Sequence, residues 1–111
     1  MKKVMRWLVL MVMVGSGGVS WAAADEPATI VIKDHQFYPA QLKLPIGKKV
    51  KLVIDNQDPT PEEFESYDLN REKVVAANAK IVVFVGPLKP GTYKYFGEFH
   101  KETAQGTIIA E

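Results

Sequence analysis

The sequence of 111 residues contains no cysteine, only two histidines and almost no excess of charge, with 14 Lys and Arg against 13 Asp and Glu. The lack of cysteine excludes disulfides, thiolate nucleophiles, cysteine zinc sites and iron–sulfur clusters. A formal net charge of +1 gives no global basic field, so nucleic-acid binding by bulk electrostatics is not expected. Few side chains could act as a general base and no nucleophile-elbow pattern is present, which argues against a serine hydrolase.

A long hydrophobic run is also lacking. The apolar stretch at 7–14 (WLVLMVMV) is well short of the ~20 residues that span a bilayer. It follows a basic start and precedes small residues at 20–24, an order typical of a secretory signal peptide. We therefore expect residues 1–24 to be a signal peptide, cleaved after Ala22 or Ala24, and a periplasmic location in a Gram-negative source. A membrane anchor is the alternative, and a lipoprotein anchor is excluded because no cysteine follows the run.

The remaining residues, 25–111, are expected to form one domain that holds neither cysteine nor methionine. A small secreted domain without disulfides must rely on its apolar core. The sequence shows short β-branched or alternating stretches and no helical stripe, with at most one helical turn at 72–78. Their spacing predicts an all-β, antiparallel β-sandwich. We expect strands at 28–33, 41–44, 49–55, 64–69, 72–75, 80–85, 92–96 and 106–110.

Acidic residues are concentrated in one part of this domain. No basic residue occurs between Lys51 and Arg71. The stretch holds six acids, which are Asp55, Asp58, Glu62, Glu63, Glu65 and Asp68. One interpretation is a solvated acidic loop. The other is a gathering of hard oxygen ligands for a cation.

Two motifs make the chain resemble a known family. The first runs from Phe37 to Val50 (FYPxxLxLxxGxxV) and precedes a strand that ends at Asn56, and the second is PGTYxYxGxxH at 90–100. Together they resemble the cupredoxin fold, a Greek-key β-sandwich, over residues 28–110. The resemblance places the family's copper-binding cysteine at Gly97 and its methionine near Ala104, and it retains His100. Without sulfur ligands a type 1 copper site cannot form.

The acidic segment Glu63-Phe64-Glu65 and the segment from Gly97 to His100 are similar to the cupredoxin-like domain of EfeO-type iron-uptake proteins. They also resemble small cupredoxin-like partners of ferrous-iron permeases. The resemblance implies a periplasmic metal-binding accessory protein of iron uptake that binds an iron ion, a copper ion or both. Its implied partners are an inner-membrane iron permease and other periplasmic iron-uptake components, and a homodimer is compatible with the sequence. At most, it would assist Fe²⁺ oxidation.

The candidate metal ligands follow from these two segments. In an extended strand Glu63 and Glu65 point to one face and Phe64 to the core, and Glu98 and His100 repeat this spacing around Phe99. Carboxylate and imidazole suit Fe²⁺, Fe³⁺, Mn²⁺, Zn²⁺ and Cu²⁺. The predicted ligands are Glu63, Glu65, Glu98 and His100, with His35 and Glu62 as further candidates.

Some of the polar residues in this region also have a plainer interpretation. Glu62 is expected to be solvated, His35 to lie in an exposed turn, and Asp68 and Arg71 to form a surface pair. Two other functions stay open for the whole chain. One is a periplasmic Cu²⁺ carrier on the same fold, and the other is a metal-free interaction module that has lost its site.

Overall fold

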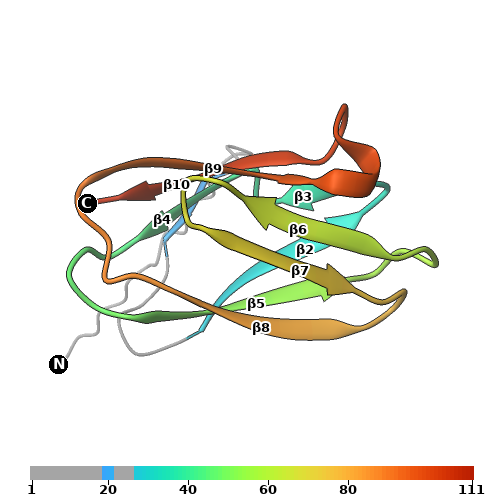
Figure 1. The fold of residues 1–111 in the computed structure, drawn as a ribbon, viewed down its shortest axis with the longest axis horizontal. Coiled ribbons are helices and arrows are strands. Elements are labelled where there is room, and N and C mark those ends of the chain that lie inside the picture. The colour runs from blue at the N-terminus through green and yellow to red at the C-terminus, as the bar shows by residue number, and fades with distance from the viewer. Residues whose placement is uncertain (1–18, 22–26) are drawn as a thin grey trace, which may run out of the picture.

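The alternating stretches form β-strands in the computed structural model, which describes residues 19–21 and 27–111 (Figure 1). The only helix in these ranges is a short 3-10 helix, η1 (Glu98–His100). No helix in the described part is long and apolar enough to cross a membrane. The strands are β1 (Val19–Trp21), β2 (Ala28–Lys33), β3 (Gln36–Tyr38), β4 (Gln41–Leu44), β5 (Val50–Asn56), β6 (Glu62–Ser66), β7 (Arg71–Val75), β8 (Lys80–Val85), β9 (Gly91–Gly97) and β10 (Gln105–Ala110).

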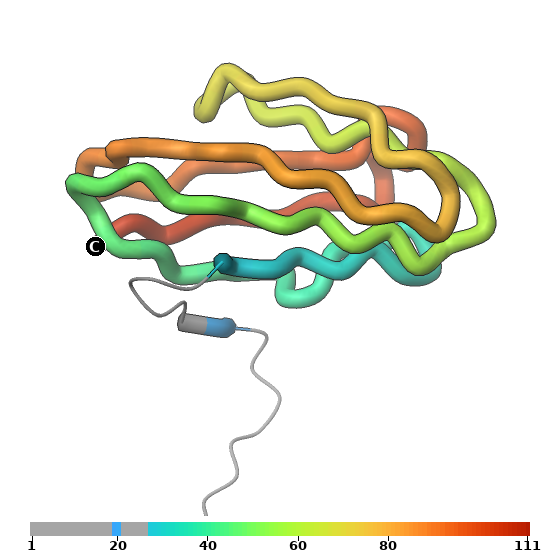
Figure 2. The backbone as a smooth tube through the Cα atoms, turned by 90° about the horizontal axis from the view of Figure 1, so that it is seen from below, coloured from blue at the N-terminus to red at the C-terminus, as the bar shows by residue number. Residues whose placement is uncertain are grey.

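Two sheets pack face to face, so the predicted all-β sandwich is confirmed. The larger sheet has the order β1-β4-β10-β9-β6-β7, and the smaller sheet has the order β3-β2-β5-β8. In Figure 2 the smaller sheet lies in front of β9 and β10. Both sheets are mixed rather than wholly antiparallel, because β2 pairs with β5, and β4 with β10 and β1, in parallel.

The core lies between the sheets and follows the alternation of the sequence. Val50, Leu52 and Ile54, which share one face of β5, are all buried. At one end the core contains an aromatic group made of Phe37, Phe64 and Tyr95, whose ring centroids lie 5.1–6.3 Å apart. The buried hydrophobic side chains are alanine, valine, leucine, isoleucine, phenylalanine and tyrosine, without a sulfur atom.

Several local predictions were wrong. The segment at 72–78 forms no helical turn. The strand expected at 72–75 is present instead, as β7, which pairs with β6 at the edge of the larger sheet. The expected strand at 64–69 starts earlier, at Glu62, since the acidic segment lies between β7 and β9. Strands β1 and β3 were not expected. The two proposed cleavage points, after Ala22 and Ala24, lie outside the described residues.

Asp68 and Arg71 do not form the expected surface pair. The Asp68 carboxylate accepts a hydrogen bond from the Lys94 backbone N–H at 2.8 Å. The Arg71 guanidinium donates to the backbone oxygens of Phe84, at 2.8 Å, and Asn70, at 2.9 Å. Both side chains therefore fix neighbouring backbone in place instead of pairing with each other.

Candidate metal centre

The register of β6 divides the acidic segment between two environments. Glu62, Phe64 and Ser66 are buried on the inner side of the strand, whereas Glu63 and Glu65 are partly exposed on its outer side. This confirms that Glu63 and Glu65 share one face and that Phe64 enters the core. It also separates Glu62 from both of them.

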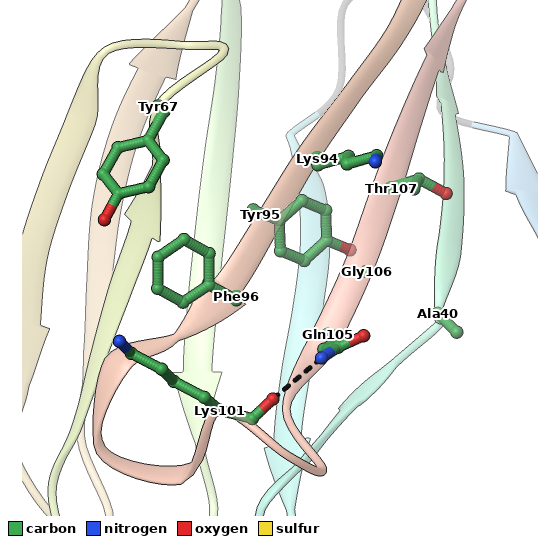
Figure 3. Close-up of a pocket in the computed structure, with 9 residues that line it drawn as sticks. All are labelled: Ala40, Tyr67, Lys94, Tyr95, Phe96, Lys101, Gln105, Gly106 and Thr107. Atoms are coloured by element: carbon green, nitrogen blue, oxygen red, sulfur yellow. Dashed lines mark hydrogen bonds between the residues drawn. The ribbon is translucent and has the colours of Figure 1, made fainter.

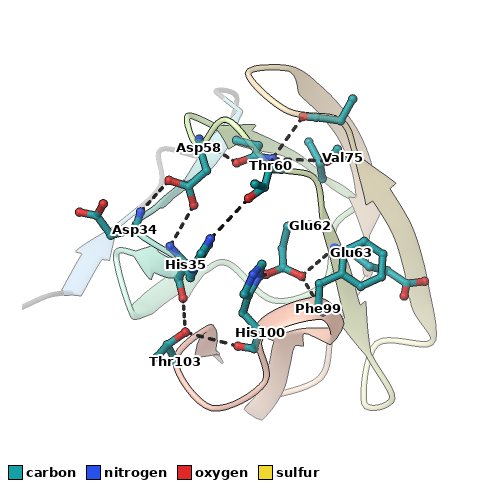
Figure 4. Close-up of polar contacts among 12 residues, drawn as sticks. Asp34, His35, Asp58, Thr60, Glu62, Glu63, Val75, Phe99, His100 and Thr103 are labelled. Atoms are coloured by element: carbon teal, nitrogen blue, oxygen red, sulfur yellow. Dashed lines mark hydrogen bonds and ion pairs between the residues drawn. The ribbon is translucent and has the colours of Figure 1, made fainter.

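The prediction that Glu62 is solvated was wrong, since the side chain is 1% exposed. Its Oε1 accepts hydrogen bonds from the backbone N–H groups of Glu63, at 2.9 Å, and Phe99, at 2.8 Å. Its Oε2 lies 2.8 Å from Nδ1 of His100 (Figure 4). Three polar contacts thus compensate the loss of water around the buried carboxylate.

Gly97 provides the room for this carboxylate. A Cβ atom at position 97 would lie 2.6 Å from both Cδ and Oε2 of Glu62, and 2.7 Å from Cβ of Ala104. Glu62 therefore occupies the volume that a side chain at position 97 would need. The place where the family resemblance locates a sulfur ligand is filled by a carboxylate.

The two histidines lie against each other beside Glu62. The rings of His35 and His100 are stacked, with centroids 3.6 Å apart and planes at 7°. His35 lies in the expected turn between β2 and β3, but it is only partly exposed. Its Nε2 is 3.4 Å from Oγ1 of Thr60, and its backbone oxygen accepts a 2.6 Å hydrogen bond from Thr103 Oγ1 (Figure 4).

The turn that carries His35 is held by Asp58, one of the six clustered acids. Asp34 and His35 have positive φ angles of 53° and 58°, a conformation that non-glycine residues adopt infrequently. The Asp58 carboxylate accepts their backbone N–H groups at 2.7 and 2.9 Å. Asp58 is thereby a structural residue that places His35 over His100, and it is not a free ligand.

Asn56 in turn fixes the loop that carries Asp58. Its side chain is fully buried, and its Nδ2 donates to the backbone oxygens of Thr60, at 2.9 Å, and Ala76, at 3.2 Å. Its Oδ1 accepts the Asp58 backbone N–H at 3.0 Å. The asparagine at the end of β5 therefore organises the polar loop that precedes β6.

The outer side of β6 carries a second acidic group, here called the outer carboxylate cluster (Glu63, Glu65 and Glu72). Its members each offer one oxygen, and these atoms all lie within 4.8 Å of one another. Glu65 lies directly opposite Glu72 in the pairing of β6 with β7. Like charges in directly opposed cross-strand positions destabilise a sheet.

This crowding raises the pKa of two of the carboxyls. A hydrogen bond with Glu72, followed by desolvation and the charges of Glu72, Glu65 and Glu98, raises the pKa of Glu63 to about 7. Desolvation, and then the charges of Glu72 and Glu98, raise the pKa of Glu65, while Lys101 partly opposes this. A divalent cation would relieve the repulsion among these groups.

The predicted ligands therefore fall into two groups. Glu63 and Glu65 join Glu72 on the outer side, with the charge of Glu98 nearby. His100 lies with Glu62 and His35 on the inner side. Among residues 19–21 and 27–111, the outer carboxylate cluster is the only set of three or more potential ligands this close together.

The predicted strand-like arrangement around Phe99 was wrong. Residues 98–100 form η1, in which Phe99 is 48% exposed, and Glu98 pairs with Lys101 at 3.6 Å. Sequence reasoning also missed Glu72, whose position opposite Glu65 depends on the register between two strands. The charged sequence of β7 gave no signal for this pairing.

A hollow lies on the outer face of the larger sheet (Figure 3). It has a volume of about 580 Å³, and its lining includes Tyr67, Lys94, Phe96 and Lys101. The rings of Tyr67 and Phe96 meet edge to face at 5.4 Å, and Lys101 Nζ lies 5.9 Å from the Phe96 centroid. No carboxylate or imidazole is among its lining residues.

Comparisons with known proteins agree with this fold. The chain is 52% identical over 80 residues to the uncharacterized protein RP394 of Rickettsia prowazekii, an alignment that covers 72% of this chain and 64% of that protein. The chain thus spans less than two thirds of that relative's length.

Two solved structures share the architecture. The metal-binding domain of the Streptococcus pneumoniae Cu(I)-exporting P-type ATPase CopA, solved with Cu(I), has a TM-score of 0.74 at 13% identity, covering 84% of this chain and 95% of that one. A reduced amicyanin mutant has a TM-score of 0.65 at 17% identity, and the match covers 80% of this chain and 86% of that one. The family model of the cupredoxin-like domain matches residues 4–110 of the sequence. The chain therefore belongs to the cupredoxin-like domain family.

Proposed function

We propose that the protein is a periplasmic metal-binding accessory of bacterial iron uptake, which binds Fe²⁺ or Fe³⁺ through the outer carboxylate cluster. The observation that carries this proposal is the approach of three carboxylate oxygens, from Glu63, Glu65 and Glu72, to within 4.8 Å of one another. Carboxylates that face each other across two strands repel, and a bound cation converts that repulsion into attraction. Oxygen ligands favour hard cations such as iron and manganese ions over Cu⁺.

The same donor set supports an assisting role in Fe²⁺ oxidation. Anionic oxygen ligands stabilise Fe³⁺ more than Fe²⁺, because the ion of higher charge gains more from them. Binding therefore favours oxidation when a separate electron acceptor is supplied. Exposure of the cluster at the edge of the larger sheet suits transfer of the ion to a partner, and we propose an inner-membrane iron permease in that role.

Calorimetric titration of the purified protein with Fe²⁺ under anaerobic conditions, and with Mn²⁺, tests the proposal. Glu65→Gln and Glu72→Gln are expected to weaken binding at least about tenfold, since each removes one anionic ligand. Glu102→Gln is the matched control, because this exposed carboxylate lies outside the cluster and binding should not change. Absence of binding, or equal affinity in all four proteins, would contradict the proposal.

A Cu²⁺ carrier is the second candidate, and the two adjacent imidazoles support it. Cu²⁺ accepts imidazole and carboxylate ligands, and His35 and His100 are 3.6 Å apart. The rings are parallel and their lone pairs lie in the ring planes, so joint binding of one ion requires one ring to rotate. Loss of Cu²⁺ binding in His100→Ala but not in Glu65→Gln would favour the carrier. If neither iron, manganese nor copper ions bind, the metal-free interaction module is favoured.

A further inference from the structure

We propose that Glu62 is a positioning residue that holds His100 in one tautomer, with the proton on Nδ1 and a free lone pair on Nε2. Nε2 is then the atom through which His100 binds a metal ion. The metal-binding half of this inference rests on the second candidate under the proposed function, in which the histidine side chains bind the ion. The tautomer half is independent of metal binding, since it concerns the metal-free protein.

The proton on Nδ1 follows from what Glu62 already accepts. Backbone N–H groups only donate, so Oε1, which accepts two of them, from Glu63 and Phe99, carries no proton. The other oxygen, Oε2, lies 2.8 Å from His100 Nδ1. Imidazole is a stronger base than a carboxylate, so the one proton shared by these two atoms lies on Nδ1, and Oε2 accepts it.

The carboxylate has no room to adopt another position. It is 1% exposed and lies over Gly97, where even a single added carbon would be 2.6 Å from Cδ. On the other side, the His35 ring is stacked on the His100 ring at 3.6 Å. The imidazole is therefore restrained along its Nδ1 edge by Glu62 and across one face by His35.

Nε2 is the ring atom that this arrangement leaves available. No described residue forms a hydrogen bond with His100 Nε2, and the side chain is 27% exposed. His100 also lines a surface groove of about 490 Å³, together with His35, Phe99, Lys101, Glu102 and Thr103. A histidine that donates one ring N–H to a carboxylate and presents the other nitrogen is the usual form of a metal-binding histidine.

Glu62→Gln is a stringent test, because it keeps the shape of the side chain and reverses the direction of its hydrogen bond with His100. The amide oxygen of Gln has to face the two backbone N–H groups, since its NH₂ cannot accept from them. The NH₂ group then faces His100 Nδ1 and donates to it. His100 must accept at Nδ1 and carry its proton on Nε2, which is the opposite tautomer.

The measurement is long-range ¹H–¹⁵N NMR of the metal-free protein at pH 8, in which the two ring nitrogens of a neutral histidine are distinguished. Wild type is expected to show an unprotonated Nε2, and Glu62→Gln an unprotonated Nδ1. Glu63→Gln, on the outer side of β6, is the matched control and should leave the tautomer unchanged. A protonated Nε2 in wild type, or the same tautomer in wild type and Glu62→Gln, would overturn the inference. Wild type alone decides the first point if the variant fails to fold.

Titration with Zn²⁺ then tests the metal-binding half. We expect Zn²⁺ to shift the His100 resonances of wild type, and Glu62→Gln to bind it about 10–100-fold more weakly. Equal affinities, or no effect of Zn²⁺ on His100 in wild type, would overturn this half. Loss of Fe²⁺ binding in Glu65→Gln addresses the iron proposal separately, so failure of one proposal is distinguishable from failure of the other.

Discussion

Substitution of Gly97 by alanine perturbs the site through one carbon atom. Gly97 has φ −96° and ψ 115°, an extended conformation that alanine adopts without strain, so the effect is purely steric. The new Cβ would lie 2.6 Å from two atoms of the Glu62 carboxylate and 2.7 Å from the Ala104 Cβ. Overpacking of this kind costs about 1–3 kcal/mol, and a displaced carboxylate loses hydrogen bonds worth about 1.5–3 kcal/mol each. We expect Gly97→Ala to lower the free energy of unfolding by about 2–4 kcal/mol.

Urea unfolding of four proteins separates this mechanism from a general defect. The set is wild type, Gly97→Ala, Glu62→Ala and the double variant. Two of the three close contacts disappear when Glu62 is truncated, and only the contact with Ala104 is left. The cost of Gly97→Ala should therefore fall by about 1–2 kcal/mol in the Glu62→Ala background. A cost under about 0.5 kcal/mol, or an equal cost in both backgrounds, would refute the reasoning.

Three further predictions concern the carboxylates. Glu72→Gln removes the hydrogen bond and the charge that raise the pKa of Glu63, so this pKa should fall from about 7 toward 4.5 in an NMR titration. Because the pKa of Glu63 in the folded protein lies above its ordinary value of 4.5, its contribution to stability is complete below pH 4.5 and is lost as the pH rises to about 7. The free energy of unfolding should therefore decline over that range in wild type, and less in Glu72→Gln; a rise would contradict the assignment. Asp58→Ala leaves the backbone N–H groups of Asp34 and His35 without their acceptor, so it should cost about 1–3 kcal/mol in urea unfolding. The ring-current shifts between His35 and His100 should vanish with it, and their persistence would show that Asp58 does not position the turn.

The sandwich was predictable because burial of one strand face leaves a period of two in the sequence. Val50, Leu52 and Ile54 show this alternation and lie in the core. The same rule placed Phe64 inside and Glu65 outside. These inferences need only the local geometry of an extended chain.

The site was only partly predictable, because its decisive contacts join residues far apart in the sequence. Glu62 and His100 are 38 positions apart, and their pairing depends on the absence of a side chain at Gly97. A buried carboxylate and a solvated one look alike in the sequence. Likewise, the approach of Glu72 to Glu65 depends on the register of β6 with β7, which the sequence does not encode locally.

The composition of the core has a consequence for durability. Fe²⁺ in contact with oxygen generates peroxide, and thiols and thioethers are among the first side chains that such oxidants attack. Oxidation of a buried methionine places a polar sulfoxide in a packed interior and loosens it. The interior between these two sheets consists of aliphatic and aromatic side chains and contains no sulfur atom. An interior of this kind would keep its packing beside the iron ion that we propose the outer carboxylate cluster binds.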